Sequence, residues 1–240
     1  MKLSNFKVLT FDCYGTLIDW ESGMVKALSP LTDKLGGKLT RNEILEAHAR
    51  HESGQQAQTP YKPYRELLAI VYRRLSEEWG IQTSWDECVQ YGNSVKEWTA
   101  FPDSAEALKY LKQHFKLVIL SNVDNVSFAE SNKKLGVDFD AIYTAEDIGS
   151  YKPSDKNFEY MISMLNRLGY EKQDILHTAE SMFHDHAPAN RHGLKSSWIY
   201  RRYEKEGFGA TMHPGDMPHY DFRFNSMKEM AEAHKLEVGG

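Results

Sequence analysis

Residues 7–16 read Lys-Val-Leu-Thr-Phe-Asp-Cys-Tyr-Gly-Thr, and this stretch decides the fold. Its apolar first half predicts a short buried strand over residues 6–11. The strand ends at Asp12, with Gly15 three residues further along the chain. An aspartate in this position lies at the carboxyl end of a strand, where open α/β sheets build their active sites. We therefore expect Asp12 to take part in chemistry, and Tyr14 to help select the reaction.

Strands and helices alternate after residue 98. Apolar segments predict strands over residues 116–121, 141–144, 174–179 and 197–200, and amphipathic segments predict helices over 104–114, 124–135, 155–168 and 226–235. The Gly-, Pro- and His-rich residues 203–219 predict a long surface loop. This alternation is typical of a parallel sheet with right-handed crossovers, so we expect an α/β fold with a Rossmann-like core.

Residues 20–98 interrupt the alternation. Helical spacing is found over residues 24–35, 41–52, 63–79 and 84–98, and the polar residues 53–60 predict a flexible loop. We expect two domains: an α/β core from residues 1–19 and 99–240, and an all-helical cap from residues 20–98. The cap is expected over the carboxyl ends of the strands, with a pocket at the junction.

Composition argues against several classes of protein. The net charge of −5 provides no electrostatic basis for binding nucleic acid or an acidic membrane. The apolar runs fall short of the roughly 20 residues that a membrane span needs. The first residues do not resemble a signal peptide, so we expect a cytoplasmic protein. Cys13 and Cys88 are the only cysteines; they have no metal-ligand spacing, and we expect Cys13 to lie in the core.

Polar side chains recur at or just beyond the carboxyl ends of the predicted strands. They come from four segments: Asp12 to Thr16, Ser121-Asn122, Lys152-Pro153, and Glu180 to Asp185. In order and spacing, these segments resemble the four motifs of the haloacid dehalogenase superfamily, over essentially the whole chain. The Asp-x-Tyr-Gly-Thr pattern and the inserted cap look most like the type II L-2-haloacid dehalogenases. That resemblance also implies a homodimer.

The resemblance implies a catalytic role for four residues. Asp12 would be a covalent nucleophile, which divides one hard displacement into two easier steps. Thr16 and Lys152 would hold Asp12 ionised and aimed through charge-assisted hydrogen bonds. Asp185 would position or activate the water that hydrolyses the resulting ester. The reaction implied is hydrolytic dehalogenation of a short (S)-2-haloalkanoic acid, with no cofactor.

Substrate binding is expected to involve both domains. Ser121 and Asn122 would bind the substrate carboxylate or the ester oxygen, and Ser181 belongs to the polar cluster of the fourth motif. The resemblance also implies a cap arginine near the halide, for which Arg50 is the candidate and Arg41 the alternative. Aromatic residues that either line an apolar pocket or only pack at the cap–core junction are Trp20, Tyr61 and Tyr64.

The identity of residue 14 is the main indication of which leaving group the protein handles. In the resemblance, superfamily phosphatases carry a second aspartate at this position as a general acid. A phenol with an ordinary pKa of about 10 is a poor proton donor at neutral pH. A halide leaves without protonation, so Tyr14 favours carbon–halogen cleavage, with the ring contributing to substrate binding. The alternative is that Tyr14 only packs under the cap.

Two other reactions remain open. Glu180 and Asp185 are spaced like the magnesium site of the phosphatases, so Asp12, Glu180 and Asp185 could bind Mg²⁺ in a phosphatase of small phosphate esters. We favour the alternative that Glu180 pairs with Lys152 and that no metal enters. A transition-metal site at His184, Asp185, His186 and His192 is not favoured, because alternating loop residues rarely converge on one ion. Nothing in the sequence directly supports a protein that acts only through binding.

Overall fold

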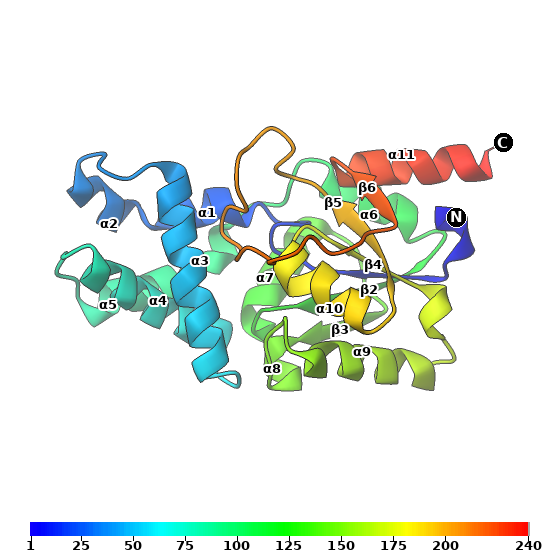
Figure 1. Cartoon of the computed structure of the whole chain (residues 1–240), viewed down its shortest axis with the longest axis horizontal. Coiled ribbons are helices and arrows are strands. Elements are labelled where there is room, and N and C mark those ends of the chain that lie inside the picture. The colour runs from blue at the N-terminus through cyan, green and yellow to red at the C-terminus, as the bar shows by residue number, and fades with distance from the viewer. Residues whose placement is uncertain (240) are drawn as a thin grey trace.

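The computed structural model describes residues 1–239 and has a helical lobe beside an α/β core (Figure 1). The core contains a six-stranded sheet in the order β3-β2-β1-β4-β5-β6, and all its neighbouring strands pair in parallel. The sheet therefore has the predicted α/β architecture, with β1 at its centre. The strands are β1 (Val8–Phe11), β2 (Lys116–Ser121), β3 (Ala141–Thr144), β4 (Ile175–Ala179), β5 (Lys195–Ile199) and β6 (Phe222–Phe224).

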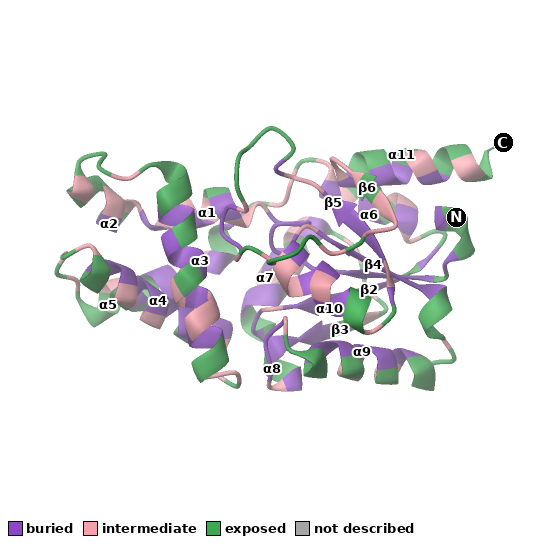
Figure 2. Ribbon diagram, in the orientation of Figure 1, coloured by how far each residue is buried: buried purple, intermediate pink, exposed green. Residues whose placement is uncertain are grey.

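Successive residues of the central strands pack on opposite faces of the sheet. In β1, Leu9 and Phe11 join one apolar cluster and Val8 joins the other. Both clusters are closed by helices, which is why the central strands β1 and β4 are buried along their length (Figure 2). One face is covered by α6 (Ser104–Leu111), α7 (Asn125–Leu135) and α11 (Met227–Val238), and the other by α8 (Ala145–Ile148), α9 (Asp155–Arg167) and α10 (Ala187–Arg191).

The inserted helices lie together on one side of the sheet, beyond the carboxyl ends of the strands (Figure 1). They are α1 (Trp20–Ala27), α2 (Ser29–Thr32), α3 (Arg41–Gln58), α4 (Tyr64–Glu78) and α5 (Trp85–Gly92), followed by a 3₁₀ turn over Asn93–Glu97. Tyr64 and Trp98 are almost fully buried where this cap meets the core. Among residues 1–239, no helix has both the length and the apolar character needed to cross a membrane.

Two local predictions are wrong. Residues 53–58, expected as a flexible loop, continue helix α3. Most of this segment consists of Gln and Ala, which are good helix formers. Gly54 destabilises the helix by only about 1 kcal/mol relative to Ala. The side chains of Gln55 and Gln56 are buried and hold this end of the helix in place. Strand β6 was also missed, because its three residues follow a long segment without helix or strand and are too few to show a strand period.

Candidate active site

The loop after β1 aims Asp12 and Thr16 at each other. The backbone N–H of Asp12 donates to the carbonyl oxygen of Thr178 at 3.1 Å, which ties the loop to β4. Gly15 then adopts a φ of +93°, a conformation that costs glycine little, and the chain turns back. The Thr16 hydroxyl consequently donates to Asp12 Oδ2 at 3.1 Å. Thr16 thereby holds one carboxylate oxygen, as predicted.

Lys152 binds the other side of Asp12 and is fully enclosed, with 1% of its surface exposed. Its ammonium donates to Asp12 Oδ1 at 3.0 Å, Asp185 Oδ1 at 2.6 Å and the Leu120 carbonyl at 2.9 Å. These contacts match the three N–H donors of a lysine. Asn122 holds the Lys152 backbone, accepting from its N–H at 2.7 Å and donating to its carbonyl at 3.0 Å. The Asn122 amide thus positions Lys152.

Asp185 has one engaged oxygen and one free oxygen. Its Oδ1 accepts from Lys152 and from His177 Nε2, the latter at 2.9 Å. His177 is oriented in turn by Thr10, whose hydroxyl lies 2.8 Å from Nδ1. Asp185 Oδ2 is buried and has no hydrogen-bond partner within residues 1–239. A buried carboxylate oxygen without a donor is suited to bind a water molecule.

The two carboxylates differ in their electrostatic setting although they share Lys152. Burial raises the pKa of Asp12 above its ordinary range, against the lowering effect of Lys152, and the charge of Asp185 adds to the rise. Burial also acts on Asp185, but Lys152 and His177 together hold the pKa of that carboxyl well below its ordinary range. Asp185 is therefore the more firmly ionised of the pair.

Several of these residues line a cavity of about 30 Å³ between the core and the cap. A water molecule needs roughly 10–15 Å³ of space for its centre, so the cavity has room for about two waters. Its position at the ends of β1, β2 and β4 is the expected one for an open α/β sheet. The lining residues are Asp12, Tyr14, Trp20, Glu52, Gln56, Tyr64, Ser121, Asn122, Lys152, Ser181, His184 and Asp185.

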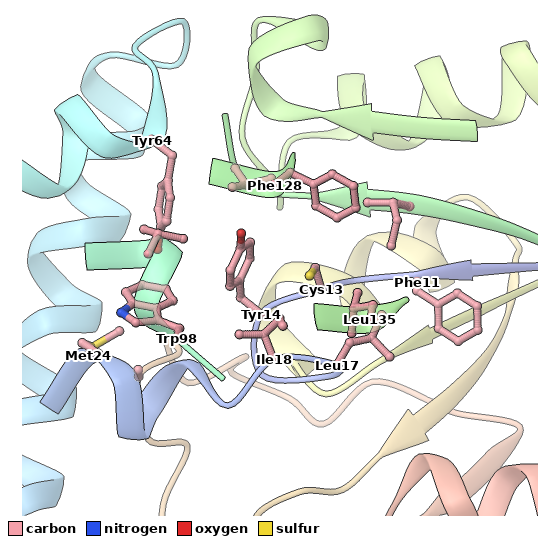
Figure 3. Close-up of a cluster of buried hydrophobic side chains, with 14 of the residues drawn as sticks. Phe11, Cys13, Tyr14, Leu17, Ile18, Met24, Tyr64, Trp98, Phe128 and Leu135 are labelled. Atoms are coloured by element: carbon pink, nitrogen blue, oxygen red, sulfur yellow. The ribbon is translucent and has the colours of Figure 1, made fainter. Parts of the chain in front are cut away.

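Tyr14 lines the cavity with its ring and turns its hydroxyl elsewhere. Figure 3 shows the ring between Tyr64 and Trp98 of the cap side and Cys13 of the core side. The hydroxyl is hydrogen-bonded to Ser131 Oγ of α7 at 2.9 Å. Burial raises the pKa of Tyr14 well above its ordinary value, so this phenol is a still weaker acid than in water. Cys13 is buried in the apolar cluster, which confirms the prediction of a core cysteine.

Comparison with known proteins identifies the family. The family model for haloacid dehalogenase-like hydrolases matches residues 6–178. The chain belongs to this family. The (S)-2-haloacid dehalogenase 4A of Burkholderia cepacia is 24% identical over 244 residues, covering 95% of this chain and 94% of its own.

Solved structures with the same fold include dehalogenases and a protein described only as a hydrolase. The L-2-haloacid dehalogenase of Xanthobacter autotrophicus with chloropropionic acid covalently bound has a TM-score of 0.75 at 16% identity, covering 98% of this chain and 100% of that one. A Bacillus subtilis protein described as a HAD-hydrolase and bound to magnesium has a TM-score of 0.73 at 18% identity, covering 96% and 99%. The fold alone therefore does not choose the reaction of this hydrolase.

The cap contributes an acidic wall to the cavity, which was not predicted. Glu52 of α3 is 4% exposed and accepts from Gln56 Nε2 at 3.1 Å, one turn further along the helix. His48, one turn earlier, places Nδ1 3.5 Å from Glu52 Oε2, and its Nε2 is hydrogen-bonded to Tyr91 at 2.7 Å. The i, i+4 spacing of these residues was available in the sequence. His48 and Glu52 lie in the helix predicted over residues 41–52, whereas Gln56 fell in the loop predicted over residues 53–60.

Arg50 is not the cap residue of the site, contrary to prediction. Its side chain is 56% exposed, and Nη2 donates to both carboxylate oxygens of Glu78 at 2.7 and 2.9 Å. Two residues on an α-helix are separated by about 200°, so a helix that turns Glu52 to the cavity turns Arg50 away from it. The alternative, Arg41, is exposed at the start of α3 and donates to Ser22 at 3.4 Å.

Glu180 does not pair with Lys152, so that prediction is also wrong. Its side chain lines a second cavity of about 20 Å³, together with the ion pair of Glu21 and Arg202. Burial, with the nearby charge of Glu21, raises the pKa of Glu180 to about 8. Within residues 1–239, no group of three His, Cys, Asp or Glu residues is arranged to hold a metal ion. Asp12 and Asp185 line one cavity and Glu180 lines the other, so the structure does not gather these three carboxylates at one place.

Ser121 and Ser181 both line the cavity, but each hydroxyl has a protein partner. Ser121 Oγ donates to Asp12 Oδ1 across 3.4 Å, a long hydrogen bond that a ligand can replace. Ser181 Oγ accepts from the backbone N–H of His184 at 3.0 Å and lies 2.9 Å from the hydroxyl of Thr211. His184, which entered the sequence analysis only as part of an unfavoured metal site, thus belongs to the same polar cluster.

Proposed function

We propose that this hydrolase is a dehalogenase of short 2-haloalkanoic acids that works through an aspartyl ester on Asp12. The observation that carries the proposal is the arrangement around Asp12. Its carboxylate is held by Thr16 and Lys152, and the residue two positions later offers no acid, because the Tyr14 hydroxyl is bonded to Ser131. Such a site suits a leaving group that departs without a proton.

In the first step, an Asp12 carboxylate oxygen attacks C2 of the substrate from the side opposite the halogen. The new C–O bond forms as the carbon–halogen bond breaks, and the halide leaves with the bonding electron pair. Lys152 keeps Asp12 ionised for this attack and fixes its direction. The single displacement at C2 inverts the configuration at that carbon.

In the second step, water attacks the carbonyl carbon of the Asp12 ester. The free Oδ2 of Asp185 accepts a proton from this water, since Oδ1 is already bound by Lys152 and His177. The acyl–oxygen bond breaks, the 2-hydroxy acid leaves with a proton, and Asp12 is restored as a carboxylate. The net products are one hydroxy acid, one halide and one proton.

The relatives support the same substrate class. The Burkholderia cepacia protein is named an (S)-2-haloacid dehalogenase, and the Xanthobacter autotrophicus structure holds chloropropionic acid covalently. We extend these properties to this chain as part of the proposal. Ser121 is the group best placed to receive the substrate carboxylate, because its hydrogen bond to Asp12 is long and easily exchanged.

A substrate panel tests the proposal. Halide release is measured from (R)- and (S)-2-chloropropionate, and phosphate release from p-nitrophenyl phosphate, each with EDTA and with added Mg²⁺. We expect EDTA-insensitive halide release from one enantiomer and lactate of inverted configuration. Turnover in ¹⁸O-labelled water should add ¹⁸O to the peptide that contains Asp12. Phosphate release that EDTA abolishes, without halide release, would establish the phosphatase alternative instead.

Asp12→Asn provides the matched control. The amide is close in shape to the carboxylate but is a far weaker nucleophile, so halide release should fall on the order of 10⁴-fold or more. The protein must be assayed freshly purified, with its mass checked, because deamidation restores aspartate. Near wild-type turnover in intact Asn protein would exclude Asp12 as the nucleophile.

A further inference from the structure

His184 carries a buried nitrogen that the mechanism above does not use. The residue belongs to the helical turn Met182–His186 and lines the same cavity as Asp12. Its Nε2 atom is buried and has no hydrogen-bond partner within the described residues. An unpaired polar atom at a ligand cavity is either a cost to stability or a contact reserved for the ligand.

The other ring nitrogen of His184 is already occupied. Nδ1 lies 3.2 Å from Ser181 Oγ and 3.4 Å from Thr211 Oγ1. Ser181 Oγ accepts the backbone N–H of His184 and shares a hydrogen bond with Thr211, so the proton of either hydroxyl can be donated to Nδ1. Burial lowers the pKa of His184 to about 4, which leaves one proton on the ring at neutral pH. When Nδ1 accepts, that proton resides on Nε2.

The hydroxyl contacts at Nδ1 therefore assign Nε2 as an N–H donor. The carboxylates of Asp185 and Glu52 add negative charge around the ring that carries this donor.

A departing halide needs such a donor in this cavity. In-line attack by Asp12 sends the halide away from Asp12 and toward the cap, where Glu52 repels an anion. Three other donors that line the cavity are engaged: Lys152 with two carboxylates, Asn122 with the backbone of Lys152, and Gln56 with Glu52. Among the described residues that line this cavity, His184 contributes a buried ring nitrogen, Nε2, that has no partner.

We propose that His184 binds the leaving halide through Nε2–H and thereby sets which carbon–halogen bonds this hydrolase can break. The inference rests on the proposed dehalogenase function. Hydrogen bonds to a developing anion strengthen as its charge becomes more concentrated. The contribution of His184 is consequently largest for fluoride, smaller for chloride and smallest for bromide. His184 is then a halogen-selecting catalytic residue.

The test compares His184→Phe and His184→Gln with wild type on 2-fluoro-, 2-chloro- and 2-bromopropionate. The parameter is kcat/KM for halide release, because it reports the steps up to ester formation, where the halide leaves. We expect His184→Phe to lose about 10²- to 10³-fold on the fluoro acid, as for removal of one oxyanion donor, and less than about threefold on the bromo acid. His184→Gln, which retains an N–H donor, should recover part of the fluoride loss.

His213→Phe, an exposed histidine in the loop that also carries Thr211, is the matched control and should leave all three rates unchanged. If wild type releases fluoride too slowly to measure, the ratio of chloride to bromide rates carries the same comparison. An equal loss on all three halogens, or no loss, would overturn the role of His184. Wild type that releases no halide from any of them would instead overturn the proposed function, and this inference with it.

Discussion

The floor and the cap wall of the cavity are built in opposite ways. The floor consists of Asp12, Lys152 and Asp185, which come from three separate segments and share one buried ammonium. The cap wall consists of Glu52 and Gln56, which lie one turn apart on a single helix. The floor is an ion cluster held together by tertiary contacts. The cap wall depends on which side of α3 faces the cavity. In the proposed mechanism the floor carries out the chemistry, and the wall influences which substrates bind.

The cavity also contains more negative than positive side chains. The floor has two carboxylates and one cation, and Glu52 adds a third carboxylate from the cap. An anionic haloacid therefore meets more negative than positive charge in this cavity. The floor must orient the substrate while the wall opposes it. One substitution in the floor, one in the wall and two at positions outside this cavity test that description.

Lys152→Met should have the largest effect, because it removes the cation that both floor carboxylates share. Leaving buried charges uncompensated should lower the free energy of unfolding by about 3–5 kcal/mol, measured by urea denaturation. Halide release should fall at least about 10²-fold in the protein that remains folded. Lys109→Met, at an exposed lysine paired with Glu106, should change stability by less than about 0.5 kcal/mol. Equal effects of the two substitutions would contradict the ion-cluster description.

Glu180→Gln should change the pH dependence of stability while leaving halide release intact. The folded-state pKa of about 8 lies above the ordinary value of 4.5, so the folded protein holds a proton that the unfolded chain has lost. This contribution to stability is complete below pH 4.5 and is lost as pH rises through about 8, by up to about 1.4 kcal/mol per pH unit. Gln stays neutral, so thermal melts of the variant should flatten this decline.

Glu204→Gln, at an exposed position, is the control for Glu180 and should leave the pH profile of the melting temperature unchanged. Loss of an EDTA-sensitive activity in Glu180→Gln would contradict the placement of Glu180 in a separate cavity and would favour a metal site.

Glu52→Gln should improve the binding of anionic haloacids, because it removes the repulsive charge of the cap wall. A unit charge several ångströms away in a partly screened site contributes about 1–2 kcal/mol, so KM should fall roughly 5- to 30-fold. Gln can still bond to Gln56, which preserves the packing of α3. Glu46→Gln, on the exposed face of the same helix, should leave KM unchanged. A higher KM in Glu52→Gln would show that Glu52 attracts the substrate.

Arg50→Ala should have the smallest effect. An exposed ion pair such as Arg50–Glu78 contributes about 0–1 kcal/mol, and the side chain lies outside the cavity. Halide release and KM should remain within about twofold of wild type in steady-state kinetics. A large rise in KM, with stability unchanged, would show that Arg50 contributes to substrate binding.

The sequence by itself determined the floor. Asp12, Lys152 and Asp185 were found because each lies at or beyond the carboxyl end of a predicted strand, and these ends meet at one edge of a parallel sheet. The cap wall was decided by tertiary structure, since whether Glu52 or Arg50 faces the cavity depends on about 200° of helix rotation. The hydrogen bonding at Nδ1 of His184 likewise depends on Thr211, which comes from a distant loop without regular structure. Local periodicity predicts elements and their ends, but the relative orientation of two packed elements is set only when the whole chain folds.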